Sequence, residues 1–155
     1  DMSSLFSSSG GIDYIVNIPD ISGWDVGNVV DMNAMFLREF QDDAFEIPNI
    51  SGWDVANVEN MGGMLYGVTS FNQDLSSWSV AKVTTMTSMF YLNINFNQDL
   101  SSWNVSQVTD MESMFSGCTN FNQPLSSWDV SKLNSMSRMF SDCTNFNQPL
   151  SSWNV

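Results

Sequence analysis

The chain has 155 residues, of which 43% are apolar, 13% are aromatic and 14% are charged, with 17 acidic side chains against 4 basic ones and a formal net charge of -13. The shortage of Lys and Arg excludes a nucleic-acid-binding protein and a protein that binds anionic membranes, because both need a basic surface. The 6 Trp and 11 Phe exclude a disordered acidic tail, since such tails are poor in aromatic residues.

A unit of about 25 residues repeats through the whole chain, and periods of this length are typical of repeat proteins. Successive tryptophans are 29, 25, 25, 25 and 25 residues apart: Trp24, Trp53, Trp78, Trp103, Trp128 and Trp153. Methionines recur in pairs three residues apart, and every Met and Trp occupies a fixed phase of the unit. We therefore predict a single array of five to six rungs over residues 1–155.

Residues 1–57 contain longer rungs than residues 58–155, which form regular rungs of 25 residues. The extra residues fall in segments 7–15 and 37–45, and because the repeat keeps its phase on both sides of them, we expect loops that bulge out of the array. The first and last residues both fall inside a repeat. We therefore expect the array to be part of a longer chain, with further repeats or neighbouring subunits at its two open ends.

The first half of a regular unit has the pattern of a short helical turn. Thr109 and Glu112 have the spacing of a capping box, in which each side chain pairs with a free backbone amide at the start of a helix. Met111, Met114 and Phe115 stand at i, i+3 and i+4, which places them on one face of a helical turn. We predict such a turn in every rung.

The second half of the unit has strand spacing, since Trp128 and Val130 are two residues apart and follow Leu125. A short helix followed by a short strand in a unit of roughly 20–29 residues is the leucine-rich-repeat plan. The predicted fold is a leucine-rich-repeat-like repeat solenoid, with short parallel strands and a short helical turn in each rung. Equivalent Trp, Met and Phe residues should then stack in continuous internal columns.

The pattern V-T-x-M-x-x-M-F-x-x-C-x-x-F-N-x-x-L-S-x-W-D-V, cleanest from Val108 to Val130, resembles the BspA-like leucine-rich-repeat surface proteins. More narrowly, it is similar to the 25-residue variant first catalogued in mycoplasma surface lipoproteins as a domain of unknown function. The resemblance is strongest over residues 58–155, and the chain departs from it where Val68 and Asn93 replace the Cys of the repeat. The resemblance implies a solenoid at the cell surface or in secreted form, used in adhesion or protein binding.

The residue types argue against an enzyme. The chain has no His, which removes Ser-His-Asp and Cys-His arrangements and His-based zinc sites, and it has no glycine-rich phosphate loop. Pairs of carboxylates for glycoside hydrolysis are offered by Asp42 with Asp43 and by Asp110 with Glu112. Loop neighbours point apart unless they are held, and Glu112 already has the predicted capping role. We expect no catalytic residues, no metal and no cofactor.

Acidic residues recur at two phases of the repeat, after the Trp and before the first Met. They are Asp25, Asp54 and Asp129 in the first phase, and Asp31 and Asp110 in the second. A calcium-binding repeat keeps a carboxylate on every rung, whereas these positions alternate with Ser, Thr and Asn. We therefore expect a solvated acidic face and no cation site.

Cys118 and Cys143 occupy the same phase of adjacent units. Equivalent positions on neighbouring rungs lie about 4.8 Å apart, within the range of about 4.4–6.8 Å that a disulfide tolerates. The alternative is a column of small buried residues with free thiols, in keeping with Val68 and Asn93 at the same phase. We favour the free thiols and keep the disulfide open.

The polar residues that flank Trp on the predicted strand face are the expected binding surface: Ser77, Ser79, Ser102, Asn104, Ser127 and Asp129. They are small and include no aromatic or Arg anchor, so the loop insertion near residues 38–43 is the alternative. Regular Ser-Ser and Asn-Gln ladders also suit ice binding, but the strand lacks the Thr array of such surfaces. Ladder hydrogen bonds that satisfy turn backbones are the better interpretation.

The leading function is a non-enzymatic, extracellular or cell-surface module for adhesion or protein–protein binding. Its charge favours basic protein partners, and no stretch reaches the roughly 18 apolar residues of a membrane-spanning helix. Asn49 and Asn104 lie in N-x-S sequons, which support secretion and glycosylation. The alternative is a structural rod or linker subunit docked in a larger assembly, including an assembly inside an organelle.

Overall fold

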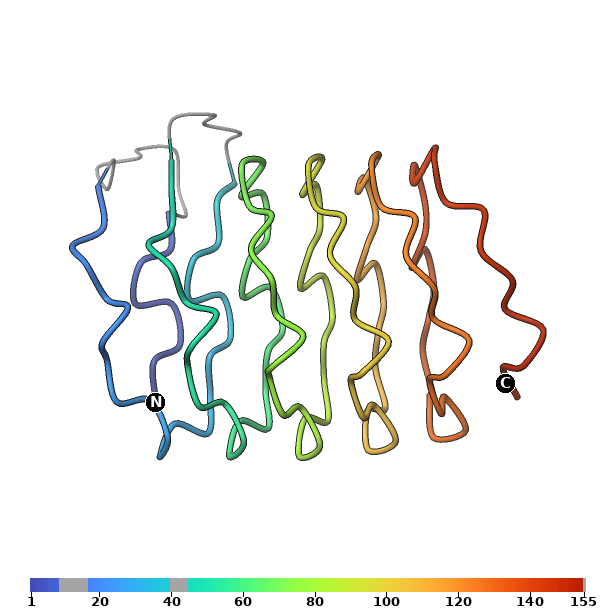
Figure 1. Ribbon diagram of the computed structural model, residues 1–155, viewed down its shortest axis with the longest axis horizontal. Coiled ribbons are helices and arrows are strands. Elements are labelled where there is room, and N and C mark those ends of the chain that lie inside the picture. Colours follow the sequence, from blue (N-terminus) through green and yellow to red (C-terminus); the bar gives the residue numbers. More distant parts are fainter. Residues whose placement is uncertain (9–16, 40–44, 155) are drawn as a thin grey trace.

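The computed structural model describes residues 1–8, 17–39 and 45–154. There the chain winds into flattened coils that stack along the long axis, with the two termini at opposite ends (Figure 1). We number the coils 1 to 6 by their first residues: Asp1, Asp31, Asn60, Thr85, Asp110 and Ser135. The last five of these residues are joined by parallel bridges, which places equivalent residues of neighbouring coils side by side. The two expected loop insertions lie largely outside the described residues, as do Asp42 and Asp43.

The predicted leucine-rich-repeat-like solenoid, with a strand and a helical turn in each rung, is wrong. The described residues contain no helix and no extended strand, and they form turns and loops joined by isolated parallel bridges. Within this part of the chain there is accordingly no helix able to cross a membrane. The coils are held together by a different arrangement of the backbone.

Consecutive four-residue turns replace the expected helix in segment 111–118. The N–H of Met114 donates to the carbonyl of Met111 at 3.2 Å, and the N–H of Cys118 donates to the carbonyl of Phe115 at 2.9 Å. Ser113, the third residue of the first of these turns, has a φ of 55°, in the left-handed region that a right-handed helix cannot include. The equivalent residue of every other coil shares this conformation: Ser4, Ala34, Gly63, Ser88 and Arg138.

Alternate amides of the same segment pair with the next coil. The N–H of Met111 donates to the carbonyl of Ser135 at 2.9 Å, and the N–H of Phe115 donates to the carbonyl of Met139 at 3.0 Å. Equivalent bonds recur at each junction from coil 1 to coil 6. On the methionine side of each coil, some amides therefore donate within the turns of that coil and the alternate ones donate to the next coil. This arrangement leaves few buried backbone groups unpaired.

The predicted capping box is wrong as well, because no helix begins there. The N–H of Glu112 donates to Oδ1 of Asp110 at 2.9 Å, which is an Asx turn. The hydroxyl of Thr109 donates to the carbonyl of Thr84 in the preceding coil at 3.1 Å. The backbone of Glu112 therefore belongs to a turn, and the side chain of Thr109 makes a contact between coils.

The segment around Trp128 is also a turn and not a strand. Its backbone N–H donates to the carbonyl of Leu125 at 3.1 Å, and its indole N–H donates to the carbonyl of Leu100 in the preceding coil at 3.0 Å. The same indole contact recurs in four other coils, at Trp53, Trp78, Trp103 and Trp153. On this side of the stack, indole groups make the links that backbone amides make on the methionine side.

Equivalent apolar side chains form internal columns along the stack, as predicted. Phe90, Phe115 and Phe140 stack with ring centroids 5.5 and 5.8 Å apart. The tryptophans of coils 2 to 5 are only 3–4% exposed: Trp53, Trp78, Trp103 and Trp128. Trp24 is 37% exposed, since it belongs to coil 1 and no described coil precedes it.

Candidate functional site

The six residues predicted as a binding surface are all exposed and lie in rows beside the Trp turns: Ser77, Ser79, Ser102, Asn104, Ser127 and Asp129. The hydroxyl of Ser102 donates to the carbonyl of Ser76 in the preceding coil at 3.0 Å, and Ser77 and Ser127 make equivalent contacts. These hydroxyls hold neighbouring coils together, which reduces what they can offer a ligand. A role for this face in binding stays a prediction.

The side chains at the acidic phases of the repeat accept hydrogen bonds from the backbone of turns. The carboxylate of Asp129 accepts the N–H of Ser131 at 3.1 Å, and the amide oxygen of Asn104 does the same for Ser106 at 3.2 Å. Hydrogen bonds from the side chain and backbone of Ser131 stabilise the anion and lower the pKa of Asp129. A neutral oxygen serves the turn equally well, which explains why acidic residues alternate with Asn along the chain. Among the described residues, no cluster of acidic or Cys side chains could hold a metal ion.

The Asn-Gln pairs form a ladder that joins the coils. The amide nitrogen of Gln123 donates to both the carbonyl and the side-chain oxygen of Asn97, each at 3.0 Å, and the N–H of Asn122 donates to the same side-chain oxygen at 3.0 Å. Gln98 and Gln148 make the equivalent contacts in their own coils. This ladder satisfies turn backbones, as the sequence indicated.

Cys118 and Cys143 are buried free thiols in neighbouring coils. The S–H of Cys118 donates to the carbonyl of Phe90 in the preceding coil at 2.9 Å, and Cys143 makes the equivalent contact at 2.8 Å. Asn93, at the same phase, donates to the carbonyl of Leu65 at 2.9 Å. Burial raises the pKa of both thiols, that of Cys143 to about 11.

Both thiols should react with iodoacetamide roughly a hundredfold more slowly at pH 8 in the native protein than after unfolding, because little thiolate is present and access is blocked. Mass spectrometry of native and urea-unfolded samples, quenched over time, measures the two rates. The result would be contradicted by fast native labelling. It would also be contradicted by an unfolded chain that takes up no label without reductant and has lost the mass of two hydrogens, which would reveal a disulfide between Cys118 and Cys143.

The two sequon asparagines, Asn49 and Asn104, have exposed side chains. Each uses its side-chain oxygen in a turn: Asn49 accepts the N–H of Ser51 at 3.0 Å, and Asn104 accepts that of Ser106 at 3.2 Å. Both positions are therefore on the surface, and their glycosylation stays a prediction.

A groove that the sequence did not reveal crosses the outer side of the methionine turns in coils 2, 3 and 4. It has a volume of about 470 Å³ and is lined by Asn33, Ala34, Leu37, Asn60, Gly62, Gly63, Tyr66, Thr85, Thr87 and Ser88. Its centre is open because small residues, Ala34, Gly63 and Ser88, fill the left-handed phase in these coils. Gly62 adds to the hollow, since a Cβ there would lie 2.9 Å from Oδ1 of Asn33.

The groove has one polar border and one apolar border. The amide and hydroxyl residues come first along each coil, and Nδ2 of Asn60 contacts Oδ2 of Asp31 at 3.4 Å. The opposite border ends on Leu37 and Tyr66, and the Tyr66 ring stacks on Tyr91 with centroids 4.5 Å apart. Partial burial, together with the neighbouring Tyr91 and Glu39, raises the pKa of Tyr66. An elongated ligand could therefore meet hydrogen-bonding groups on one side and rings on the other.

The signal for this groove lies in departures from the repeat. Gly62 and Gly63 stand where coil 5 has Glu112 and Ser113, and Tyr66 stands where coil 5 has Ser116. The phases that every unit shares build the core. Residues that differ from unit to unit are the ones that shape this part of the surface.

A family model described as Mycoplasma protein of unknown function, DUF285, matches residues 1–92 and, in a second match, residues 78–155. The two matches together span the chain and confirm the resemblance to the mycoplasma-type domain of unknown function. They do not confirm the BspA-like leucine-rich-repeat assignment. No curated protein and no solved structure gives a match.

Proposed function

This chain belongs to the DUF285 family of Mycoplasma proteins of unknown function, and we propose that it is a non-enzymatic module that binds a partner protein. The partner inserts an extended, basic segment into the groove over coils 2 to 4. The observation that carries this proposal is the groove itself, a hollow of about 470 Å³ with a polar and an apolar border.

The borders suit an extended peptide. Asn60, Thr85 and Thr87 provide amide and hydroxyl groups that can pair with the backbone of such a segment, while Leu37 and Tyr66 provide contact area for its apolar side chains. The hydroxyls of Thr85 and Thr87 lie 3.1 Å apart, so they present a paired donor and acceptor. Backbone pairing gives affinity with little dependence on sequence, and the apolar border selects among side chains.

Charge favours a basic segment. The groove lining contains no Lys or Arg, and Asp31 contacts it through Asn60. The whole chain carries a net charge of -13, which attracts cationic partners and repels anionic ones. Association should therefore weaken as the salt concentration rises.

We also propose that the module works at the cell surface or in secreted form, in adhesion or in protein binding. This location is supported by the resemblance of the repeat to mycoplasma surface lipoproteins and by the exposed sequons at Asn49 and Asn104. A structural rod or linker subunit in a larger assembly is the second candidate. The Asn-Gln and indole hydrogen bonds that join neighbouring coils into one stack favour it.

Selection from a displayed library of short random peptides tests the groove. We expect enrichment of peptides that contain Lys or Arg, and synthetic copies of these should bind about tenfold or more weakly to Thr87→Trp, which fills the groove, and to Tyr66→Ser, which removes its apolar border. Both changes should be tolerated by the fold, because Glu112 and Ser116 occupy the same two phases in coil 5.

The matched control is Ser137→Trp, which adds the same bulk at the phase of Thr87 but in coil 6, outside the groove. The affinity of Ser137→Trp for the selected peptides should equal that of the unmodified chain. Equal binding by Thr87→Trp and the unmodified chain would overturn the proposal, and so would selection of acidic peptides only.

A further inference from the structure

The side chain of Asn33 lines the polar border of the groove and has no hydrogen-bond partner in the part of the chain that the structure describes. The other groups of this border are engaged. Oδ1 of Asn60 accepts the N–H of Gly62 at 3.0 Å. The hydroxyls of Thr85 and Thr87 contact each other at 3.1 Å. Asn33 therefore offers the groove a complete carboxamide, with two N–H donors and one carbonyl acceptor.

The surroundings of Asn33 hold this carboxamide in place. Its backbone N–H donates to Oδ1 of Asp31 at 2.8 Å, and its backbone carbonyl accepts the N–H of Ser4 in coil 1 at 2.8 Å. Oδ1 of Asn33 lies 2.9 Å from the point that a Cβ on Gly62 would occupy, so the carboxamide fills space that a side chain at residue 62 would take. A group whose backbone is already fixed loses less conformational entropy when it binds a ligand.

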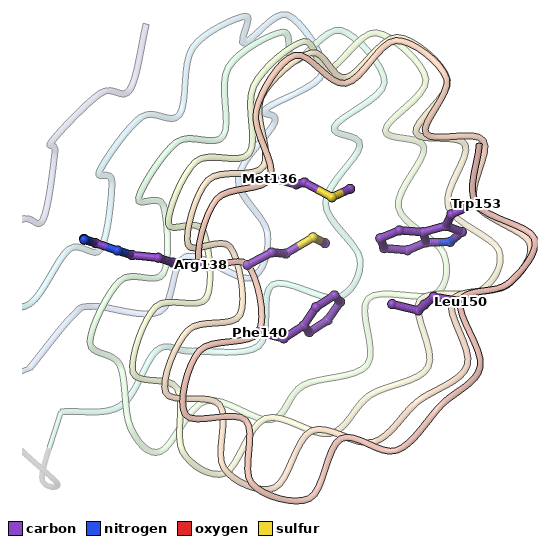
Figure 2. A pocket seen from close by; sticks show the side chains of 6 residues that line it. Met136, Arg138, Phe140, Leu150 and Trp153 are labelled. Carbon is purple, nitrogen blue, oxygen red and sulfur yellow. The ribbon is translucent and has the colours of Figure 1, made fainter. Parts of the chain in front are cut away.

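The phase that follows Asn33 points out of the stack, toward the groove. Its member in coil 6 is Arg138, and Figure 2 shows the Arg138 side chain pointing away from the ring of the coil, whereas Phe140 points into it. In coils 2 and 3 the same phase holds Ala34 and Gly63. The hollow beside the carboxamide is open because these small residues stand where a long outward side chain could be.

A carboxamide has the hydrogen-bonding groups of one residue in an extended strand. Such a residue presents its N–H and its C=O on the same side, and in an antiparallel pair it exchanges both bonds with a single opposing residue. Nδ2 and Oδ1 of Asn33 can take the place of that opposing residue. Ser88 is the other polar lining residue whose side chain has no partner among the described residues, but one hydroxyl oxygen cannot span an N–H and a C=O.

We infer that Asn33 fixes the register of the peptide segment in the groove by pairing with the N–H and the C=O of one of its residues, an inference that rests on the proposed function. The paired residue needs a free N–H, so proline is excluded at this one position. Its side chain is not contacted by the pair, so the position accepts many other residues. Asn33 is thus a positioning residue, while Leu37 and Tyr66 provide the apolar contact area.

Ester scanning of a bound peptide tests the pair. The probe is a synthetic copy of the basic peptide that the displayed library enriches most, with a set of analogues in which each backbone N–H in turn is replaced by an ester oxygen. For the unmodified chain, the ester at the paired residue should weaken binding about tenfold, because Oδ1 of Asn33 then faces an oxygen and not a donor. Titration calorimetry at constant salt measures the affinities.

Asn33→Leu nearly keeps the volume of the side chain and removes its hydrogen-bonding groups. It should bind the all-amide peptide about tenfold more weakly than the unmodified chain, and the ester at the paired residue should weaken this variant less than about twofold. The penalties of the other esters should be the same in both proteins. The fold should tolerate the change, because this phase holds Gly, Thr, Glu and Ser in coils 3 to 6.

Ser137→Leu is the matched control, since it places the same residue at the same phase of coil 6, outside the groove. It should bind every peptide of the set as the unmodified chain does. Near-UV circular dichroism of the tryptophans checks that each variant is folded, and Asn33→Ala replaces Asn33→Leu if the latter is not.

The inference is overturned if folded Asn33→Leu binds the all-amide peptide as tightly as the unmodified chain, or if every ester penalty persists in this variant. Failure of the proposed function gives a different result: Thr87→Trp and Tyr66→Ser then bind like the unmodified chain, or no basic peptide is selected, and the role of Asn33 falls with it. Loss of affinity in Thr87→Trp without loss in Asn33→Leu would leave the groove as the binding site and exclude Asn33 as its positioning residue.

Discussion

Gly67→Ala is expected to lower the free energy of unfolding by about 3 kcal/mol, a large loss for one added methyl group. Gly67 has a φ of 72°, where an L side chain is strained, and a Cβ there would overlap the carbonyl oxygen of Arg38 in the preceding coil. The Arg38 backbone cannot move away easily. Its N–H donates to the carbonyl of Tyr66 at 2.8 Å, and its guanidinium lies 3.3 Å from the centroid of the Phe45 ring.

Urea unfolding followed by Trp fluorescence measures this loss. Gly52→Ala is the matched control, because a Cβ at Gly52 meets no atom within 4 Å. We expect its free energy of unfolding to lie within about 0.5 kcal/mol of that of the unmodified chain. Similar losses in the two variants would show that residue 67 does not have the close contact with Arg38.

Trp103→Ala is expected to lower the free energy of unfolding by about 3–5 kcal/mol, the usual cost of removing a large aromatic side chain from a core. Trp103 is 3% exposed, packs against Phe90 with centroids 6.3 Å apart and donates its indole N–H to the carbonyl of Leu75 at 3.0 Å. That carbonyl also accepts the N–H of Trp78, so it keeps one partner in the variant. Most of the loss should therefore come from the cavity.

Trp24→Ala provides the comparison within the same column, because Trp24 is 37% exposed at the N-terminal end. Trp24→Ala should lower the free energy of unfolding by about 1–2 kcal/mol, because this partly exposed side chain buries less apolar area on folding. Urea unfolding measures both losses. Equal losses for Trp24→Ala and Trp103→Ala would contradict the continuous column.

The local conformation of the repeat could not be predicted from its apolar spacing. Residues at i and i+3, such as Met111 and Met114, lie together in a helix and also at the two ends of a four-residue turn. The two alternatives differ at Ser113, whose φ of 55° ends any helix. The useful signal was Gly63, which stands at the same phase in coil 3 and adopts the same conformation without a side chain.

The candidate groove was missed for a different reason. Its lining comes from three coils, and Tyr66 and Thr87 become neighbours of one hollow only when those coils are stacked. The Ser and Asp residues proposed from the sequence were placed on an exposed face correctly, but three of the serine hydroxyls are engaged with the preceding coil. Exposure at a fixed phase could be predicted, whereas the hydrogen-bond partners of each side chain could not.

The amino-acid sequence alone was sufficient for the period of the repeat, the phase of each Trp, Met and Phe, and the burial of these residues in shared columns. These properties depend on which residues are apolar and how far apart they stand. The turn conformations, the backbone hydrogen bonds between coils and the groove depend on the stack of coils. An amide of one coil pairs with a carbonyl roughly 25 residues away, and the identity of either residue says nothing about that bond because backbone groups are the same in every residue.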